Sequence, residues 1–152
     1  MALDVGQKAP EFTLNNQSGE SISLAALLKT GPIVLFFFPK AFTKVCTAEA
    51  CSFGASLDKF ENLKTTVVGI STDDEATLSR FKKQYELSYN LLADKKGTIA
   101  KKYDAYVPIL GFSTRVTYII GADGLIKGVH SGMLQAEPHI QKTLKQLAMV
   151  SQ

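Results

Sequence analysis

The chain has 152 residues, and 45% of them are apolar. It contains two cysteines and has a formal net charge of +3. This length predicts a single domain over residues 1–152 with a sizeable core, and two cysteines are too few for a disulfide scaffold. The scattered basic residues lack the interleaved aromatic residues of a nucleic-acid surface, and the apolar run 33–38 is far too short to span a membrane. Since the first ten residues hold no apolar leader, we expect a cytoplasmic protein whose cysteines are reduced at rest.

Short apolar runs rich in strand-forming residues alternate with amphipathic segments. Phe12–Leu14 and Ser21–Ser23 flank a polar turn and predict an opening hairpin. Ile33–Phe38 has no polar face, which is typical of a strand buried on both sides. A helical stretch is predicted from about Thr43 to Leu63, and a second buried strand over Thr65–Ser71.

Two further helices are predicted after that strand. Thr72-Asp73-Asp74-Glu75 has the pattern of a capping box, which would open a helix over Ala76–Glu86. A shorter helix is predicted over Thr98–Tyr103.

The last third of the chain predicts a hairpin and a helix. Arg115–Ile120 and Leu125–His130 read as strands joined by the turn Gly121–Gly124, and His139–Met149 reads as the closing helix. The order of elements predicts an α/β fold with a mixed central sheet and helices on both faces.

Both cysteines lie just after the first buried strand, at the expected start of a helix. With Thr43 as N-cap, Cys46 occupies the third helical position, where unpaired N–H groups and the positive end of the helix dipole favour a thiolate. A thiolate attacks electrophiles, so this position predicts a nucleophilic cysteine. The alternative is that Cys46 is a small buried apolar residue. The placement of Pro39, Thr43 and Cys51 around it favours the nucleophile.

Cys51 follows Cys46 by five positions. In a regular helix such positions differ by about 140° and about 7.5 Å along the axis. Their Cα atoms are then roughly 8.6 Å apart, beyond the limit of about 7 Å for a disulfide. Either Cys51 never pairs with Cys46, or the helix unwinds by at least a turn when it does. If Cys46 is oxidised to a sulfenic acid, Cys51 is the nearest thiol able to condense with it.

A metal site from the two cysteines with His130 or His139 is disfavoured, because the spacing is not Cys-x-x-Cys and neither histidine belongs to a ligand cluster. The chain also lacks a P-loop and a Gly-x-Gly-x-x-Gly motif. We therefore expect neither a metal nor a cofactor.

Pro39, Thr43 and Cys46 match the pattern Pro-x-x-x-Thr-x-x-Cys, and at these residues the chain closely resembles the peroxiredoxins. The resemblance covers nearly the whole chain. The second cysteine five positions on is similar to the peroxiredoxin Q, or bacterioferritin comigratory protein, subfamily. Four further segments carry the resemblance: 5–14, 68–73, 91–94 and 115–120.

The resemblance implies a thioredoxin-like fold and thiol-dependent reduction of hydroperoxides. Cys46 would be the peroxidatic nucleophile and Cys51 the resolving thiol, joined in an intramolecular redox disulfide. The implied reductant is thioredoxin or glutaredoxin, and the implied state is a monomer.

The resemblance also implies supporting roles for residues around the cysteine. Arg115 would donate to the thiolate and the peroxide, and its charge would lower the pKa of the thiol. Thr43 would hydrogen-bond the peroxide and the thiolate. Pro39 would shield the site from water, and Glu49 would help to orient the arginine.

Lys44-Val45 stands where relatives often have Pro-Gly, so proline constrains this loop less. Two other functions are weighed against a peroxidase. A general thiol–disulfide oxidoreductase on the same fold would use Cys-x-x-Cys, which this chain lacks. A non-enzymatic redox sensor or holdase is not supported by any partner motif.

Overall fold

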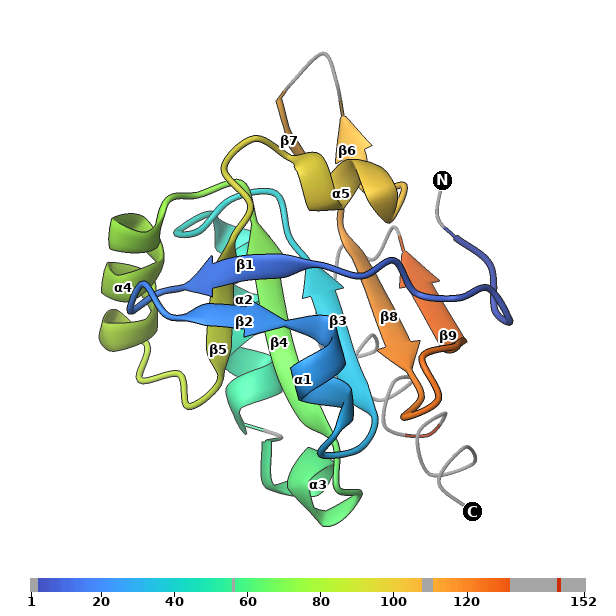
Figure 1. Ribbon diagram of the computed structural model, residues 1–152. Coiled ribbons are helices and arrows are strands. Elements are labelled where there is room, and N and C mark those ends of the chain that lie inside the picture. Colours follow the sequence, from blue (N-terminus) through green and yellow to red (C-terminus); the bar gives the residue numbers. More distant parts are fainter. Residues whose placement is uncertain (1–2, 56, 108–110, 132–144, 146–152) are drawn as a thin grey trace.

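The computed structural model describes residues 3–55, 57–107, 111–131 and 145 (Figure 1). Within them, seven strands form one sheet in the order β2-β1-β5-β4-β3-β8-β9. These strands are β1 (Thr13–Asn16), β2 (Ser21–Ser23), β3 (Ile33–Phe37), β4 (Thr66–Ser71), β5 (Asn90–Ala93), β8 (Val116–Ile120) and β9 (Ile126–Ser131). A separate two-stranded ribbon pairs β6 (Tyr106–Val107) with β7 (Phe112–Ser113).

The centre of the sheet is parallel and its flanks are antiparallel. Strand β4 pairs in parallel with β3 and with β5. Strand β8 runs antiparallel to β3 and to β9, and the β1–β2 hairpin joins the other side through an antiparallel pairing of β1 with β5. The predicted mixed sheet is thus confirmed, as is the hairpin turn of residues 121–124, where the Gly124 N–H donates to the Gly121 carbonyl at 2.9 Å.

Helices cover both faces of the sheet, as the sequence predicts. They are α1 (Leu24–Leu28), α2 (Lys44–Ala55), α3 (Leu57–Asn62), α4 (Glu75–Gln84) and α5 (Thr98–Lys102). Figure 1 shows α1 in front of the sheet and α2 behind it.

Because side chains alternate along a strand, β3 supplies both cores. Phe36 packs into the core beneath α2, α3 and α4, and Leu35 and Phe37 pack into the core beneath α1 and α5.

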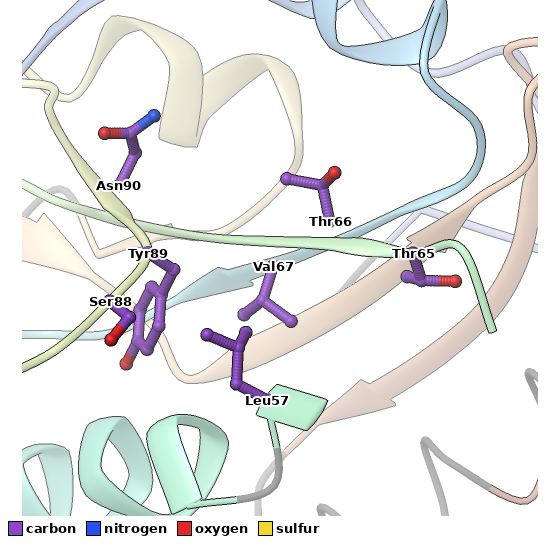
Figure 2. A pocket seen from close by; sticks show the side chains of 7 residues that line it. All are labelled: Leu57, Thr65, Thr66, Val67, Ser88, Tyr89 and Asn90. Atoms are coloured by element: carbon purple, nitrogen blue, oxygen red, sulfur yellow. The ribbon is translucent and has the colours of Figure 1, made fainter. Parts of the chain in front are cut away.

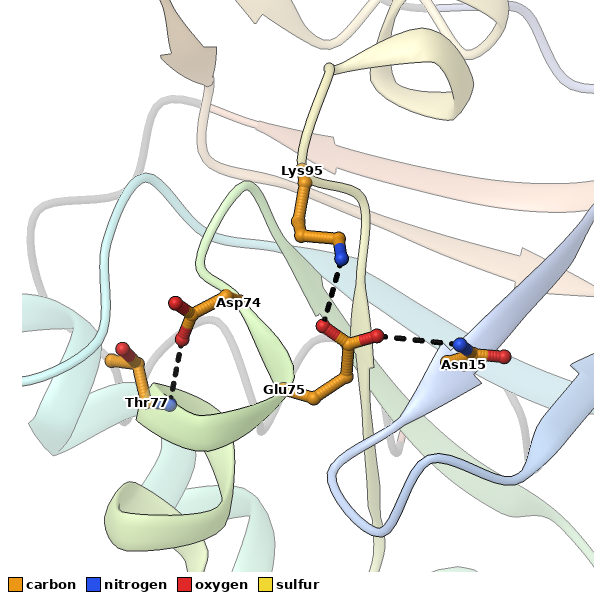
Figure 3. Close-up of polar contacts among 5 residues, drawn as sticks. All are labelled: Asn15, Asp74, Glu75, Thr77 and Lys95. Atoms are coloured by element: carbon orange, nitrogen blue, oxygen red, sulfur yellow. Dashed lines mark hydrogen bonds and ion pairs between the residues drawn. The ribbon is translucent and has the colours of Figure 1, made fainter.

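The start of α4 differs from the predicted capping box. The N-cap is Asp74, whose Oδ1 accepts the Thr77 N–H at 2.8 Å, and the helix begins at Glu75 (Figure 3). The Glu75 carboxylate is bound by Lys95 at 3.1 Å and by Asn15 at 3.3 Å. The prediction of a capping box that starts at Thr72 is therefore wrong, because Asp74, two residues later, is the N-cap.

Other boundaries also differ from the predictions. Strand β5 was not predicted, and the stretch expected as one helix over 43–63 contains both α2 and α3, on either side of residue 56. The closing helix expected at 139–149 lies outside the described residues, apart from Lys145. In the described segments, no helix has the length and apolar character needed to cross a membrane.

Candidate active site

The pairing of the strands brings most of the predicted site residues to one edge of the sheet. Strands β3 and β4 are parallel neighbours, so their carboxyl ends lie side by side, and the Phe38 N–H extends this ladder by donating to the Ile70 carbonyl at 3.0 Å. The residues 38–43 that follow, here called the 38–43 loop, connect β3 to α2. On the other side of β3, Val116 pairs with Phe37. Arg115 directly precedes Val116, so its backbone lies at the same edge as the 38–43 loop.

The helix after this loop begins where the cysteine motif predicts. Helix α2 starts at Lys44, and the Thr43 carbonyl accepts the N–H of Thr47 at 2.8 Å, as expected of an N-cap residue. Cys46 is therefore the third residue of the helix, within the turn whose N–H groups have no intrahelical partner. The side chains of Cys46 and Glu49 lie outside the described part of the structure.

Pro39 and Thr43 lie at the two ends of the 38–43 loop. Pro39 is half-buried, whereas Thr43 is exposed and its hydroxyl donates to the Lys40 carbonyl at 2.8 Å. A threonine hydroxyl has one proton to donate and two lone pairs. Because the hydroxyl proton of Thr43 is donated to the Lys40 carbonyl, the Thr43 oxygen can only accept hydrogen bonds from other groups.

The 38–43 loop contains a strained residue held by aromatic contacts. Phe42 has a φ of 67°, in the left-handed region that bulky side chains rarely adopt. Phe42 is 42% exposed, and its ring packs edge-on against Phe81 of α4, with 5.1 Å between centroids, and at a tilt against Tyr85, with 6.4 Å between centroids. Such strain persists where the surroundings hold the backbone in place.

A carboxylate from the next strand connection contacts the middle of the loop. The Ala41 N–H donates to Oδ2 of Asp73 at 2.7 Å, and the Ser71 hydroxyl donates to the same oxygen at 2.7 Å. Sequence reasoning missed this contact because it placed Asp73 in a capping box. The available signal was the parallel pairing of two buried strands, since connections that leave neighbouring carboxyl ends lie side by side.

Cys51 lies on the same continuous helix as Cys46 and is half-buried. Burial raises the pKa of its thiol, so Cys51 is protonated at neutral pH. Just before it, the carbonyl of Ala50 accepts the Tyr89 hydroxyl at 2.7 Å in a buried contact. Tyr89 thus ties the middle of α2 to the segment that leads into β5.

A cavity of about 200 Å³ lies at the opposite edge of the sheet, at the amino ends of β4 and β5 (Figure 2). It is lined by Leu57, Thr65, Thr66, Val67, Ser88, Tyr89 and Asn90. Because Cys46 follows the carboxyl end of β3, this cavity is separate from the candidate active site. Among the described residues, no group of three or more His, Cys, Asp or Glu is placed to hold a metal ion.

Comparison with known proteins identifies the class. Residues 5–129 match the AhpC/TSA family. The chain is 37% identical over 141 residues to the chloroplastic peroxiredoxin Q of Oryza sativa subsp. japonica, an alignment that covers 92% of this chain and 64% of that protein. It is 33% identical to peroxidoxin BcpB from Mycobacterium tuberculosis, with a TM-score of 0.93 and coverage of 97% and 98% of the two chains.

Similarity in fold extends further. Peroxiredoxin Q from Xanthomonas campestris, at 20% identity, has a TM-score of 0.85 and covers 93% of this chain and 92% of its own. The fold and the match over residues 5–129 define a member of the peroxiredoxins, with their thioredoxin-like fold. The chain belongs to the AhpC/TSA family, and its resemblance to peroxiredoxin Q is confirmed at the level of sequence. It spans 64% of the length of the rice relative.

Proposed function

We propose that this chain reduces hydrogen peroxide and organic hydroperoxides, with Cys46 as the peroxidatic residue. The observation that carries the proposal is the position of Cys46. It is the third residue of α2, at the edge of the sheet where Thr43 and the backbone of Arg115 also lie. At that position the helix dipole and unpaired N–H groups favour the thiolate over the thiol.

In the first step the Cys46 thiolate attacks one peroxide oxygen and the O–O bond breaks. The sulfur is oxidised to a sulfenic acid, and the departing oxygen takes a proton to become water or an alcohol. Negative charge grows on that oxygen, so donors near it lower the barrier. Arg115 and the amides of the first turn of α2 are the proposed donors, while Thr43 accepts the peroxide O–H.

In the second step the Cys51 thiol displaces the sulfenic oxygen of Cys46, forming a disulfide and releasing water. Helix α2 is continuous from Lys44 to Ala55, so this step requires it to unwind. Thioredoxin, or a glutaredoxin, then reduces the disulfide by thiol–disulfide exchange. Because both cysteines come from one chain, the cycle needs no second subunit. We propose a monomer working in the cytoplasm.

The test is stopped-flow oxidation of the fully reduced protein by hydrogen peroxide and by an organic hydroperoxide. We expect a second-order rate constant far above that of a simple thiol, one disulfide formed per peroxide consumed, and sustained turnover with thioredoxin, thioredoxin reductase and NADPH. A rate like that of free cysteine would refute the proposal. Rapid reduction of insulin without peroxide turnover would instead indicate a general thiol–disulfide oxidoreductase.

The unwinding step makes a separate prediction about Tyr89. Replacing Tyr89 with Phe removes the hydrogen bond to the Ala50 carbonyl and keeps the ring that packs against Phe36. A hydrogen bond of this kind contributes about 0.5–1.5 kcal/mol net. Opening of α2, and with it disulfide formation after a peroxide pulse, is therefore expected to become about two- to tenfold faster.

Tyr85→Phe is the matched control, since its hydroxyl contacts the exposed Gln84 side chain rather than α2. Amide hydrogen exchange over residues 44–55 of the reduced proteins should rise in Tyr89→Phe and stay unchanged in the control. Equal exchange and equal disulfide formation in the two variants would contradict a role for Tyr89 in holding α2 closed.

A further inference from the structure

The Asp73 carboxylate joins two segments at the active-site edge, and its role bears on the proposed function of Cys46. Its Oδ2 accepts the N–H of Ala41, in the middle of the 38–43 loop, and the hydroxyl of Ser71, the last residue of β4. Both donor–acceptor distances are 2.7 Å. A third bond runs from the Asp73 N–H to the Ser71 oxygen at 3.2 Å.

The surroundings fix the carboxylate in place. Ser71 is fully buried, and its carbonyl accepts the N–H of Asp94 at 2.9 Å, so it belongs to the rigid centre of the sheet. Ala41 is 6% exposed, which leaves its N–H little access to water. A carboxylate that accepts a backbone N–H forms a stronger bond than a neutral oxygen does. Asp73 therefore fastens the loop to β4 at a point five residues before Cys46.

We infer that Asp73 is a positioning residue for Cys46: by holding Ala41 against the end of β4, it fixes the course of the 38–43 loop into the first turn of α2. Without this contact the loop is expected to change conformation, because the backbone of Phe42 is strained and a shift of the loop would relieve that strain. A shift there displaces Thr43, the N-cap, and with it the N–H groups that stabilise the Cys46 thiolate. Asp73 acts through the backbone and does not touch the reacting atoms.

A positioning role and a purely electrostatic role predict opposite results. A negative charge near the edge disfavours a thiolate, so removing it would lower the pKa of Cys46 and speed its oxidation. Loss of positioning raises that pKa toward the ordinary value and slows oxidation. The conservative variant separates the two, because Asp73→Asn removes the charge but keeps an oxygen for the Ala41 N–H.

The experiment compares Asp73→Ala and Asp73→Asn, each in a Cys51→Ser background so that only Cys46 reacts. We measure the rate constant with hydrogen peroxide and the pKa of Cys46 from thiolate absorbance. Asp73→Ala should slow oxidation about 10- to 100-fold, as expected for a misplaced reacting group, and raise the pKa. Asp73→Asn should stay within about threefold of the parent, because a neutral acceptor retains about half the bond strength.

Asp74→Ala is the control. Asp74 is the neighbouring carboxylate, but it caps α4 by accepting the Thr77 N–H (Figure 3) rather than an N–H of the 38–43 loop. It should lower thermal stability and leave the pKa and oxidation rate of Cys46 unchanged. If Asp73→Ala does not fold, Ser71→Ala takes its place, because it removes two of the bonds that fix Asp73, and it should slow oxidation to a smaller degree.

Faster oxidation in both Asp73 variants overturns the inference in favour of electrostatics. Equal slowing by Asp73→Ala and Asp74→Ala overturns it in favour of general destabilisation. Failure of the proposed function can be distinguished from both outcomes. In that case Cys46 would be oxidised no faster than free cysteine even in the protein that retains Asp73.

Discussion

Replacing Cys46 with serine is expected to abolish peroxide turnover. A serine hydroxyl stays protonated at neutral pH without an adjacent general base, and its oxygen cannot be oxidised as sulfur is. Enzymes typically accelerate their reactions by at least about 10⁶-fold. Removal of the reacting sulfur should abolish this acceleration. Peroxide consumption coupled to thioredoxin and NADPH should then fall to the rate measured without the protein.

The substitution is nearly isosteric, so circular dichroism and the thermal midpoint of Cys46→Ser should match the parent closely. Cys51→Ser provides the second control, because it retains Cys46 and should still consume one equivalent of peroxide. Turnover by Cys46→Ser at a substantial fraction of the parental rate would show that another group reacts with peroxide.

The central strands could be predicted because the composition of their sequences strongly favours a buried β-strand. The run that becomes β3 is continuously apolar, and the run that becomes β4 has an apolar centre, Val67–Ile70. Both are rich in branched or aromatic residues, and such runs form strands buried on both faces. Strand β5 was missed because it has only four residues, Asn90–Ala93, and becomes a strand by pairing with β4 and β1. The information that makes it a strand lies in its neighbours rather than in its own pattern.

The cap of α4 shows how local patterns compete. Thr72 and Glu75 have the spacing of a capping box, yet Asp74 is also a strong N-cap residue and stands directly before the helix. Tertiary contacts decide between them, since Glu75 is bound by Lys95 and Asn15. That outcome leaves Asp73 outside the helix and able to reach Ala41.

The position of Cys46 at the third residue of α2 was predictable from Thr43 and the preceding strand, and is confirmed. The Asp73–Ala41 contact was not, because its partners are 32 residues apart and meet only when β3 and β4 pair. The contact between Tyr89 and Ala50 was not predictable either, because its partners are 39 positions apart in the sequence. Local motifs thus indicate the proposed reacting residue, and sheet topology brings the residues that contact its loop and helix into place.

Replacing Cys51 with serine is expected to preserve one round of oxidation and to block recycling by thioredoxin. The sulfenic acid on Cys46 then has no second thiol in the chain, because Cys46 and Cys51 are its two cysteines. Intact-mass analysis after one equivalent of peroxide should show a gain of about 16 Da for one added oxygen, and excess peroxide should add a second oxygen to give the sulfinic acid. Thioredoxin-dependent NADPH oxidation should fall to background after the first turnover.

The parent protein treated in the same way should lose two thiols and gain no oxygen, because water leaves when the disulfide forms. Adding a small thiol such as glutathione should restore peroxide turnover to Cys51→Ser, since any accessible thiol can condense with a sulfenic acid. Undiminished turnover of the variant with thioredoxin alone would mean that thioredoxin attacks the oxidised Cys46 directly. In that case α2 would have no need to unwind, and Cys51 would be an ordinary half-buried helix residue whose thiol stays protonated because burial raises its pKa.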